Sequence, residues 1–436
     1  MKILPSLSGA HWPDGAYNRR GLPERVLQFG TGMLLRALCA ASVDEANRAG
    51  RFAGRIVVVQ NTPGGNARAL NAQNGLFTLV ERGLENGKRV ERTRLIGAIS
   101  RALVADTEWE TVREIAARPD IQVIVSNSTE AGFRIDAVFP ARLTDALHAR
   151  FERLPDGPLL FVIPTELVPD NGPRLAAMVD ELAGRTARPD AFRRWLSTRV
   201  RFCSSLVDRI TTGAPSANER AALEAGLGYS DALLTVAEPY SFWAIEGDPP
   251  ALRNAFPIDV RGESVVFAPD IGFYEERKLR LLNATHTAVT PVALLAGIRT
   301  VREAMDHPKL GAFLRRILFD EIIPATDLPT EAAVQFAHAV IERFCNPWLD
   351  HEWRTISTNQ EAKMRIRVEP LIVAFTNRRQ RAPEGLTLAC AAHLTFLRAP
   401  METLAEASRL PGFVAAVARW STVIAQEGVE GALAHD

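Results

Sequence analysis

The chain has 436 residues, 47% of them hydrophobic, which is too long for a single ordinary core and predicts two domains. Its 51 Lys and Arg residues balance 51 Asp and Glu residues, so it lacks the bulk charge that draws a protein to nucleic acid or to an anionic membrane. It contains no run of about 18 apolar residues, which excludes a conventional membrane-spanning helix.

The four cysteines are far apart, and none forms a CxxC pair; they are Cys39, Cys203, Cys345 and Cys390. This spacing shows neither a zinc knuckle nor a redox motif, and it is typical of reduced core residues in a cytosolic protein. The N-terminal stretch MKILPSLSGAHWPDG lacks the long apolar core of a signal peptide. We therefore expect a cytoplasmic protein.

In the first part of the chain, short apolar runs alternate with helical patterns. The run at 55–60, RIVVVQ, is typical of a strand that is buried on both faces. A helical pattern at 108–117 separates two of the later runs. The strand-like runs cover residues 26–29, 55–60, 121–126 and 159–164. This alternation predicts an α/β domain with a Rossmann-like, doubly wound parallel sheet.

After about residue 270 the pattern changes to helices rich in Ala and Leu. They are predicted at 278–298, 301–305, 308–319, 331–344 and 386–397. Comparable runs of buried strands do not appear there. We place the linkage near residues 265–270, which gives a Rossmann-like cofactor-binding domain over 1–270 and a mainly α-helical substrate and catalytic domain over 271–436.

The first strand runs into a glycine-containing turn, GTGMLLR at 30–36. Gly30 and Gly32 permit a tight turn and close backbone approach, and a following helix offers free N–H groups to a pyrophosphate. The spacing is incomplete, because Leu35 stands where the full GxGxxG pattern has a third glycine. A plain strand-to-helix turn therefore remains as an alternative to a cofactor site that includes Arg36.

The second strand ends in Gln60 and Asn61, where an acidic residue would bind the ribose of NAD. An amide can still form a hydrogen bond with a ribose hydroxyl, so we include Gln60 in the cofactor site. No arginine follows immediately to suggest a pocket for the 2′-phosphate of NADP, although Arg68 is not far away. We expect NAD.

The segment KLRLLNATH at 278–286 carries the clearest chemistry. In an α-helix each residue turns by about 100°, so Asn283 and His286 fall on one broad face with Lys278. Hydride transfer from an alcohol needs a base for the hydroxyl proton and donors for the developing oxyanion. A buried lysine, an amide and an imidazole can supply them. The alternative is a solvated lysine, a helix-stabilising asparagine and a buried structural histidine.

The same spacing, Lys-xxxx-Asn-xx-His, resembles the signature of the mannitol dehydrogenase family, the polyol-specific long-chain dehydrogenases. Other stretches resemble that family in the same order along the chain, from Leu27 to about Pro370. They are VDRIT at 207–211, EP at 238–239 with Trp243, and RFCNP at 343–347. The resemblance implies a metal-independent, NAD-dependent dehydrogenase in which Lys278, Asn283 and His286 are catalytic.

Within the family, the chain resembles most closely the branch that acts on sugar acids. The motifs are LQFG at 27–30, SNSTEAG at 126–132, PTEL at 164–167, FCSSLVDRI at 202–210 and LLNATHT at 281–287. Leu167 stands where the mannitol branch has an asparagine, which argues against a simple polyol. Thr165, Ala284 and Thr285 depart from the sugar-acid pattern, which leaves the particular acid open.

A sugar acid brings a carboxylate, so the resemblance implies a cation in the site. The run KMRIRV at 363–368 forms a wholly basic face if it is extended, but its charges spread around the axis if it is helical. An ordinary charged surface is the alternative, and we favour Lys363 from the resemblance. The resemblance also places His351, Glu166 and Asp208 at the substrate. Ser126 and Asn127 end a strand at the carboxyl edge of the sheet, where cofactors bind.

Three rival interpretations remain. The substrate could be a neutral polyol or ketose, such as mannitol and fructose, or a related uronate. The protein could be an NAD-binding sensor, which would have no need for a proton-transferring lysine. A zinc enzyme would require clustered Cys, His and carboxylate ligands, and the sequence shows no such cluster. The sequence leaves the oligomeric state open.

Overall fold

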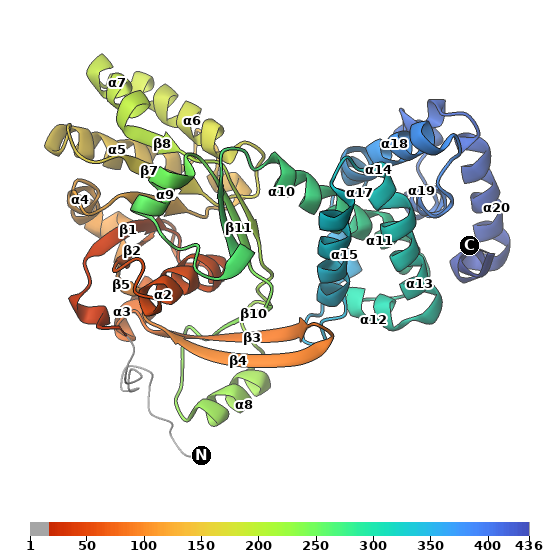
Figure 1. Cartoon of the computed structure of the whole chain (residues 1–436), viewed down its shortest axis with the longest axis horizontal. Helices are drawn as coiled ribbons and strands as arrows, with labels where there is room; N and C mark the ends of the chain where they lie inside the picture. The colour runs from red at the N-terminus through yellow and green to blue at the C-terminus, as the bar shows by residue number, and fades with distance from the viewer. Residues whose placement is uncertain (1–16, 436) are drawn as a thin grey trace. The chain divides into compact units, whose positions relative to one another are not determined.

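The computed structural model describes residues 17–435, so the N-terminal stretch used to argue against a signal peptide lies outside the described residues. The chain divides into two compact units (Figure 1). The first comprises 17–82 and 91–271 of the described residues, and the second comprises 83–90 and 272–435. Within residues 17–435, every helix is too short or too polar to span a membrane.

The first unit is built on a six-stranded parallel sheet in the order β5-β2-β1-β6-β7-β8. Its strands are β1 (Glu24–Phe29), β2 (Arg55–Gln60), β5 (Ile99–Val104), β6 (Val123–Ser126), β7 (Leu160–Pro164) and β8 (Val200–Phe202). The order runs outward in both directions from β1, as the doubly wound prediction requires. The predicted fold class is confirmed.

Helices cover both faces of this sheet because alternate side chains of each strand point to opposite sides. Val26, Ile56 and Val123 belong to one core, whereas Leu27, Val57 and Ile124 belong to the other. The helices are α1 (Met33–Leu35), α2 (Ala41–Arg48), α3 (Ala67–Ala72), α4 (Ala105–Ala116), α5 (Val138–Arg153), α6 (Asn171–Arg185), α7 (Asp190–Arg199), α8 (Ala217–Leu227) and α9 (Pro249–Ala255). A π-helical segment, η3 (Arg36–Ala40), joins α1 to α2.

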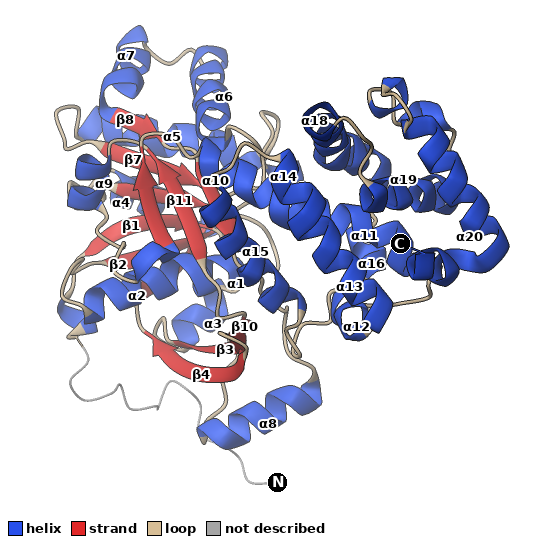
Figure 2. Ribbon diagram, turned by 45° about the vertical axis from the view of Figure 1, so that its right-hand side comes forward, coloured by secondary structure: helices blue, strands red, loops and turns tan. Residues whose placement is uncertain are grey.

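Two small sheets that the sequence analysis did not predict complete the first unit (Figure 2). One contains β3 (Phe77–Glu85), β4 (Lys88–Ile96) and β10 (Thr235–Ala237), and the other contains β9 (Ser205–Asp208), β11 (Phe242–Glu246) and β12 (Val265–Ala268). The tip of the β3–β4 hairpin, residues 83–90, belongs to the second unit. There the Gly87 N–H donates to Glu342 Oε1 at 2.6 Å.

The rest of the second unit is helical, and α11 lies at its centre, packed against α16 and α19. Its α-helices are α10 (Gly272–Arg277), α11 (Thr285–Leu295), α12 (Val301–Asp306), α13 (Pro308–Arg316), α14 (Ile323–Ala325), α15 (Thr330–Phe344), α16 (Trp353–Ile356), α17 (Gln360–Lys363), α18 (Glu369–Arg379), α19 (Glu384–Leu397) and α20 (Phe413–His435). Three π-helical segments interrupt them: η6 (Lys278–Ala284), η7 (Ile317–Ile322) and η8 (Met364–Val368).

Candidate active site

The glycine-containing turn lies between β1 and α1. Gly30 has a φ of +127°, and a Cβ there would lie 3.0 Å from the carbonyl oxygen of Asn127, so a side chain would be both strained and tightly packed. Gly32 caps α1, and a Cβ at Gly32 would meet nothing within 4 Å. Open space therefore adjoins the first N–H groups of a helix. This arrangement fits the pyrophosphate of a dinucleotide.

Arg36 follows this turn but points into the protein. Its Nε donates to Thr235 Oγ1 at 3.0 Å and its Nη1 donates to the Thr31 carbonyl oxygen at 2.6 Å. Only 4% of the residue is exposed, and burial lowers the pKa of its guanidinium to about 10. Through these contacts Arg36 stabilises the backbone of the glycine-containing turn from its buried side. Arg36 remains a predicted cofactor residue, with a supporting geometry.

The end of β2 also uses its polar groups internally. Gln60 Oε1 accepts a hydrogen bond from the Ala67 N–H at 3.0 Å, which satisfies a free donor at the start of α3. Arg142 of α5 donates to both the backbone and the side-chain oxygen of Asn61, each at 2.9 Å. Arg142 lies far from β2 in the chain, so no local sequence pattern links it to this strand end.

The ends of β6 and β7 are joined through a buried carboxyl group. Glu166 Oε2 accepts from Ser126 Oγ at 3.1 Å, and its Oε1 accepts from the Ser128 N–H at 2.7 Å. Burial raises the pKa of Glu166. Asn127 Nδ2 donates to Thr165 Oγ1 at 3.0 Å. Three predicted site residues, Ser126, Asn127 and Glu166, thus lie together at the carboxyl edge of the sheet.

Asp208 ends β9 and is buried, with 5% of the residue exposed. Its neighbour Arg209 pairs with a different carboxylate, because Arg209 Nη2 lies 2.5 Å from Glu81 Oε1. Burial alone would raise the pKa of Glu81, but Arg209 and then Arg94 outweigh it, so the pKa is lowered. Arg209 and Glu81 form a buried ion pair of the first unit.

The lysine segment of the second unit departs from the predicted α-helix. Residues 278–284 form the π-helix η6, and a regular α-helix resumes at Thr285. A π-helix closes each turn with hydrogen bonds between residues five apart, so Lys278 and Asn283 are separated by about one turn. The calculation with 100° per residue is therefore wrong for this pair. The π-helix brings the two side chains closer to one face than an α-helix would.

His286 lies in the first turn of α11 and is stacked on Phe344, with ring centroids 4.2 Å apart. Its Nε2 is buried and has no hydrogen-bond partner among the described residues. The His351 ring stands edge-on to it at 5.2 Å. The pKa of His286 lies well below its usual value, first because of burial and then because of His351, Arg343, Arg367 and Lys363. His286 is therefore a neutral imidazole with an unused polar atom.

Asn283 and Lys278 are both partly buried. The backbone oxygen of Asn283 accepts from Thr287 Oγ1 at 2.8 Å. Its side-chain amide, in contrast, has no hydrogen-bond partner within the described part of the chain. The amide is therefore available to a ligand. His351 is also partly buried, and burial, Arg343 and Lys363 lower its pKa.

The basic run at 363–368 is helical, so the extended alternative is wrong. Lys363 ends α17, and η8 continues from Met364. Lys363 Nζ donates to the Ile356 carbonyl oxygen at 2.8 Å, and burial and Arg367 lower the pKa of its ammonium group. The second unit thus brings together four predicted site residues: His286, His351, Lys363 and Asn283.

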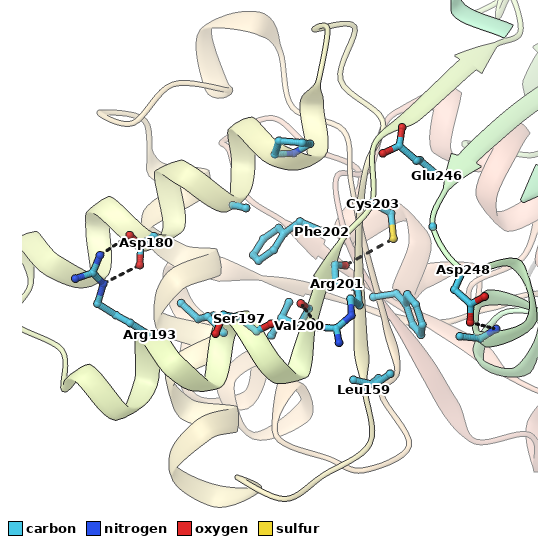
Figure 3. A pocket seen from close by; sticks show the side chains of 16 residues that line it. Leu159, Asp180, Arg193, Ser197, Val200, Arg201, Phe202, Cys203, Glu246 and Asp248 are labelled. Carbon is cyan, nitrogen blue, oxygen red and sulfur yellow. Dashed lines mark hydrogen bonds and ion pairs between the residues drawn. The ribbon is translucent and has the colours of Figure 1, made fainter. Parts of the chain in front are cut away.

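A cavity of about 880 Å³ lies elsewhere in the first unit, beside the edge strand β8 (Figure 3). Phe202, Cys203, Glu246 and Arg201 are among the residues that line it. It contains none of the predicted site residues. Separately, no group of three or more His, Cys, Asp or Glu side chains within residues 17–435 is arranged to hold a metal ion.

Family models match both parts of the chain. The mannitol dehydrogenase Rossmann domain matches residues 24–255, and the mannitol dehydrogenase C-terminal domain matches residues 270–435. An altronate oxidoreductase of Klebsiella pneumoniae (strain 342) is 38% identical over 412 residues, which are 92% of this chain and 84% of that protein. An altronate oxidoreductase of Halalkalibacterium halodurans is 38% identical over 395 residues, which are 88% of this chain and 77% of that protein.

Two solved structures share the fold. A substrate-free D-sorbitol dehydrogenase has a TM-score of 0.83 at 22% identity and covers 99% of this chain and 100% of its own. The Pseudomonas fluorescens mannitol 2-dehydrogenase, solved with NAD and D-mannitol, has a TM-score of 0.72 at 23% identity and covers 97% and 96%. The resemblance found in the sequence is confirmed: this chain belongs to the mannitol dehydrogenase family.

Proposed function

We propose that this protein is an NAD-dependent oxidoreductase that interconverts D-tagaturonate and D-altronate, a hexulosonate and an aldonate, in hexuronate catabolism. One observation carries the proposal. In a chain 38% identical to altronate oxidoreductases, the Asn283 amide and His286 Nε2 have no partner among the described residues and lie in a region with two basic side chains. Unused polar groups near cations suit a polar, anionic ligand.

The first unit supports the choice of cofactor. The open space beside Gly32 and the first turn of α1 suits a pyrophosphate, and NAD supplies the hydride donor or acceptor when it is bound. Gln60, Ser126 and Asn127 hold the neighbouring loops in place. Asp106 pairs with Arg142 beside Asn61, which reduces the positive charge available to a 2′-phosphate and favours NAD over NADP.

The second unit supports the acid–base chemistry. Reduction adds a hydride to the carbonyl carbon and a proton to the carbonyl oxygen. Lys278 gives that proton from its ammonium group in reduction and takes it back in oxidation, while the Asn283 amide donates to the same oxygen. The neutral His286 orients a sugar hydroxyl through Nε2. His351 contacts further hydroxyls and Lys363 faces the carboxylate.

All four cysteines are free thiols, which suits a reducing cytoplasm. We propose that the protein acts there on small molecules, without a nucleic-acid or membrane partner. Electrophilic assistance comes from an ammonium group and an amide, so we expect no metal requirement. The matching measurement is activity after extensive treatment with a strong chelator, which should be unchanged.

The main test follows NADH oxidation with D-tagaturonate, D-fructuronate and D-fructose for the parent and for Lys278→Ala. We expect fastest turnover of D-tagaturonate by the parent and almost none by the variant. Lys309→Ala is the matched control, because this exposed lysine only contacts a backbone oxygen of α20. Turnover retained by Lys278→Ala would refute the lysine role. Activity confined to D-fructose would reject the sugar-acid substrate in favour of a neutral ketose.

A further inference from the structure

The helical form of the basic run sorts its three cations into two kinds. Met364 and Val368 are fully buried and anchor η8 to the core. Arg365 points outward: its side chain is 56% exposed, and it pairs with Glu361 at 3.3 Å. Lys363 and Arg367, four residues apart, are both partly buried. The basic run therefore has two partly buried cations, Lys363 and Arg367, which we call the inward cations, and one surface arginine, Arg365.

Arg367 reaches the helix that carries the predicted catalytic residues. Its Nη1 donates to Thr287 Oγ1 at 3.3 Å, and Thr287 directly follows His286. Gln360 Nε2 donates to the Thr287 carbonyl oxygen at 2.8 Å, and Thr287 Oγ1 donates to the Asn283 carbonyl oxygen at 2.8 Å. Thr287 thus ties α17 and η8 to η6 and α11. The Arg367 guanidinium thus contacts the residue that follows His286, and its charge is among those that lower the pKa of His286.

The two inward cations have only neutral partners within the described residues. Lys363 donates to a backbone oxygen and Arg367 to a hydroxyl, and neither pairs with a carboxylate. Arg280, on the neighbouring π-helix, pairs with Glu276 at 2.7 Å in the usual way. Burial lowers the pKa of Arg367, which reports that its charge is partly desolvated. A desolvated cation without a counterion is stabilised by an anionic ligand.

We propose that Arg367 is the residue that recognises the substrate carboxylate and so selects a sugar acid over a neutral ketose. Arg367 suits this role better than Lys363, because a guanidinium offers five N–H donors in a planar fork and only one of them forms a hydrogen bond within residues 17–435. Lys363 is held by Ile356 and adds a second positive charge. The inference rests on the proposed function, because it assumes a sugar-acid substrate.

The test compares Arg367→Met with Arg365→Met, which removes the same charge two residues away on the exposed side. Steady-state rates are measured with D-tagaturonate and with D-fructose at saturating NADH. Arg367→Met should raise the KM for D-tagaturonate roughly 10- to 100-fold, the range expected for loss of charge-assisted hydrogen bonds. The rate with D-fructose should stay unchanged or rise. Arg365→Met should match the parent with both substrates.

Binding of D-altronate, followed by calorimetry without turnover, separates this inference from the proposed function. Binding that is lost in Arg367→Met and kept in Arg365→Met supports the carboxylate contact, even if the parent oxidises no NADH with D-tagaturonate. Equal binding by both variants, or no binding by the parent, overturns it. Arg367→Gln serves as a second variant, because its amide can keep the hydrogen bond to Thr287 and so preserve the fold.

Discussion

The predicted site residues of the two units differ in what their polar atoms do. In the first unit, Arg36, Gln60, Ser126, Asn127 and Glu166 all form hydrogen bonds within their own unit. In the second unit, the Asn283 amide and His286 Nε2 have no described partner, and two cations have only neutral ones. The first set shapes loops around a space, whereas the second set is left to contact a ligand directly.

This contrast teaches that a position near a site has two physical meanings. A satisfied group contributes mainly to stability, because its removal leaves a buried partner without a hydrogen bond. A buried group without a partner does not stabilise the folded state, and its hydrogen-bonding capacity is left for a ligand. Substitutions in the first unit should therefore change stability, and substitutions in the second unit should change kinetics.

The largest effect is expected from the buried pair of the first unit. Glu81→Gln keeps the shape of the side chain but leaves the Arg209 guanidinium, which is almost fully buried, without its counterion. We expect the free energy of unfolding to fall by about 3–5 kcal/mol. Urea unfolding followed by circular dichroism measures it.

The double variant Glu81→Leu, Arg209→Met is the control for this prediction, because removing both charges together should restore much of the lost stability. Equal stability of the parent and Glu81→Gln would contradict the ion-pair argument. It would also weaken the view that polar groups of the first unit act mainly as supports.

Asn283→Ala should affect the reaction rather than the fold. Losing one donor to a developing oxyanion lowers kcat by about 10²–10³-fold, and the midpoint of thermal unfolding should stay within a few degrees of the parent. The measurement is steady-state NADH oxidation together with a thermal melt. An active Asn283→Ala variant would remove Asn283 from the proposed mechanism.

Asn171→Ala is the matched asparagine of the first unit. The Asn171 amide donates to the carbonyl oxygens of Glu166 and Ser205 and accepts from the Ser205 N–H, so its loss leaves several buried groups unpaired. We expect the free energy of unfolding to fall by about 1–3 kcal/mol. At a temperature well below its melting point, this variant should retain most of its kcat. The contrast between the two units would be wrong if Asn283→Ala lowered mainly the stability and Asn171→Ala lowered mainly kcat.

Much of the first unit could be predicted from local patterns. The runs at 26–29, 55–60, 121–126 and 159–164 match β1, β2, β6 and β7 to within two residues, because strands buried on both faces are continuous apolar runs. The hairpin of β3 and β4 was missed. Most of β4 is exposed and charged, so its sequence carries no core-facing alternation.

The candidate site was predicted in its residues but not in its geometry. Lys278 and Asn283 share a face through a π-helix, and one extra residue in a turn leaves no mark on a helical hydrophobic pattern. Arg367 and Arg365 look equivalent in the sequence. The burial of Met364 and Val368 sets which side of η8 faces the core, and so leaves Arg365 exposed and Arg367 partly buried. Arg142 and the Thr287 contacts depend on residues distant in the chain, which no local pattern reports.

The smallest predicted effect tests whether an unused polar atom is enough to mark a site. His393 in α19 is fully buried, both of its ring nitrogens lack a partner among the described residues, and burial lowers its pKa to about 4 from 6.5. Burial is the only resolved cause of the lowered pKa of His393. The pKa of His286, in contrast, is also lowered by nearby cations. We therefore interpret His393 as a core residue, although His393, like His286, has a buried ring nitrogen without a partner among the described residues.

The pKa of His393 is lower in the folded protein than in the unfolded chain. As the pH falls from 6.5 towards 4, the unfolded chain therefore binds more protons at His393 than the folded protein does. The free energy of unfolding falls over this range. Between about pH 7 and about pH 5.5 the loss amounts to about 1 kcal/mol. His393→Leu should remove that increment without changing kcat, as urea unfolding at the two pH values would measure. If His393→Leu folds normally but has a lower kcat, a buried nitrogen without a partner serves the reaction even away from the cations. The contrast between the two units would then have to include His393 as well as Asn283 and His286.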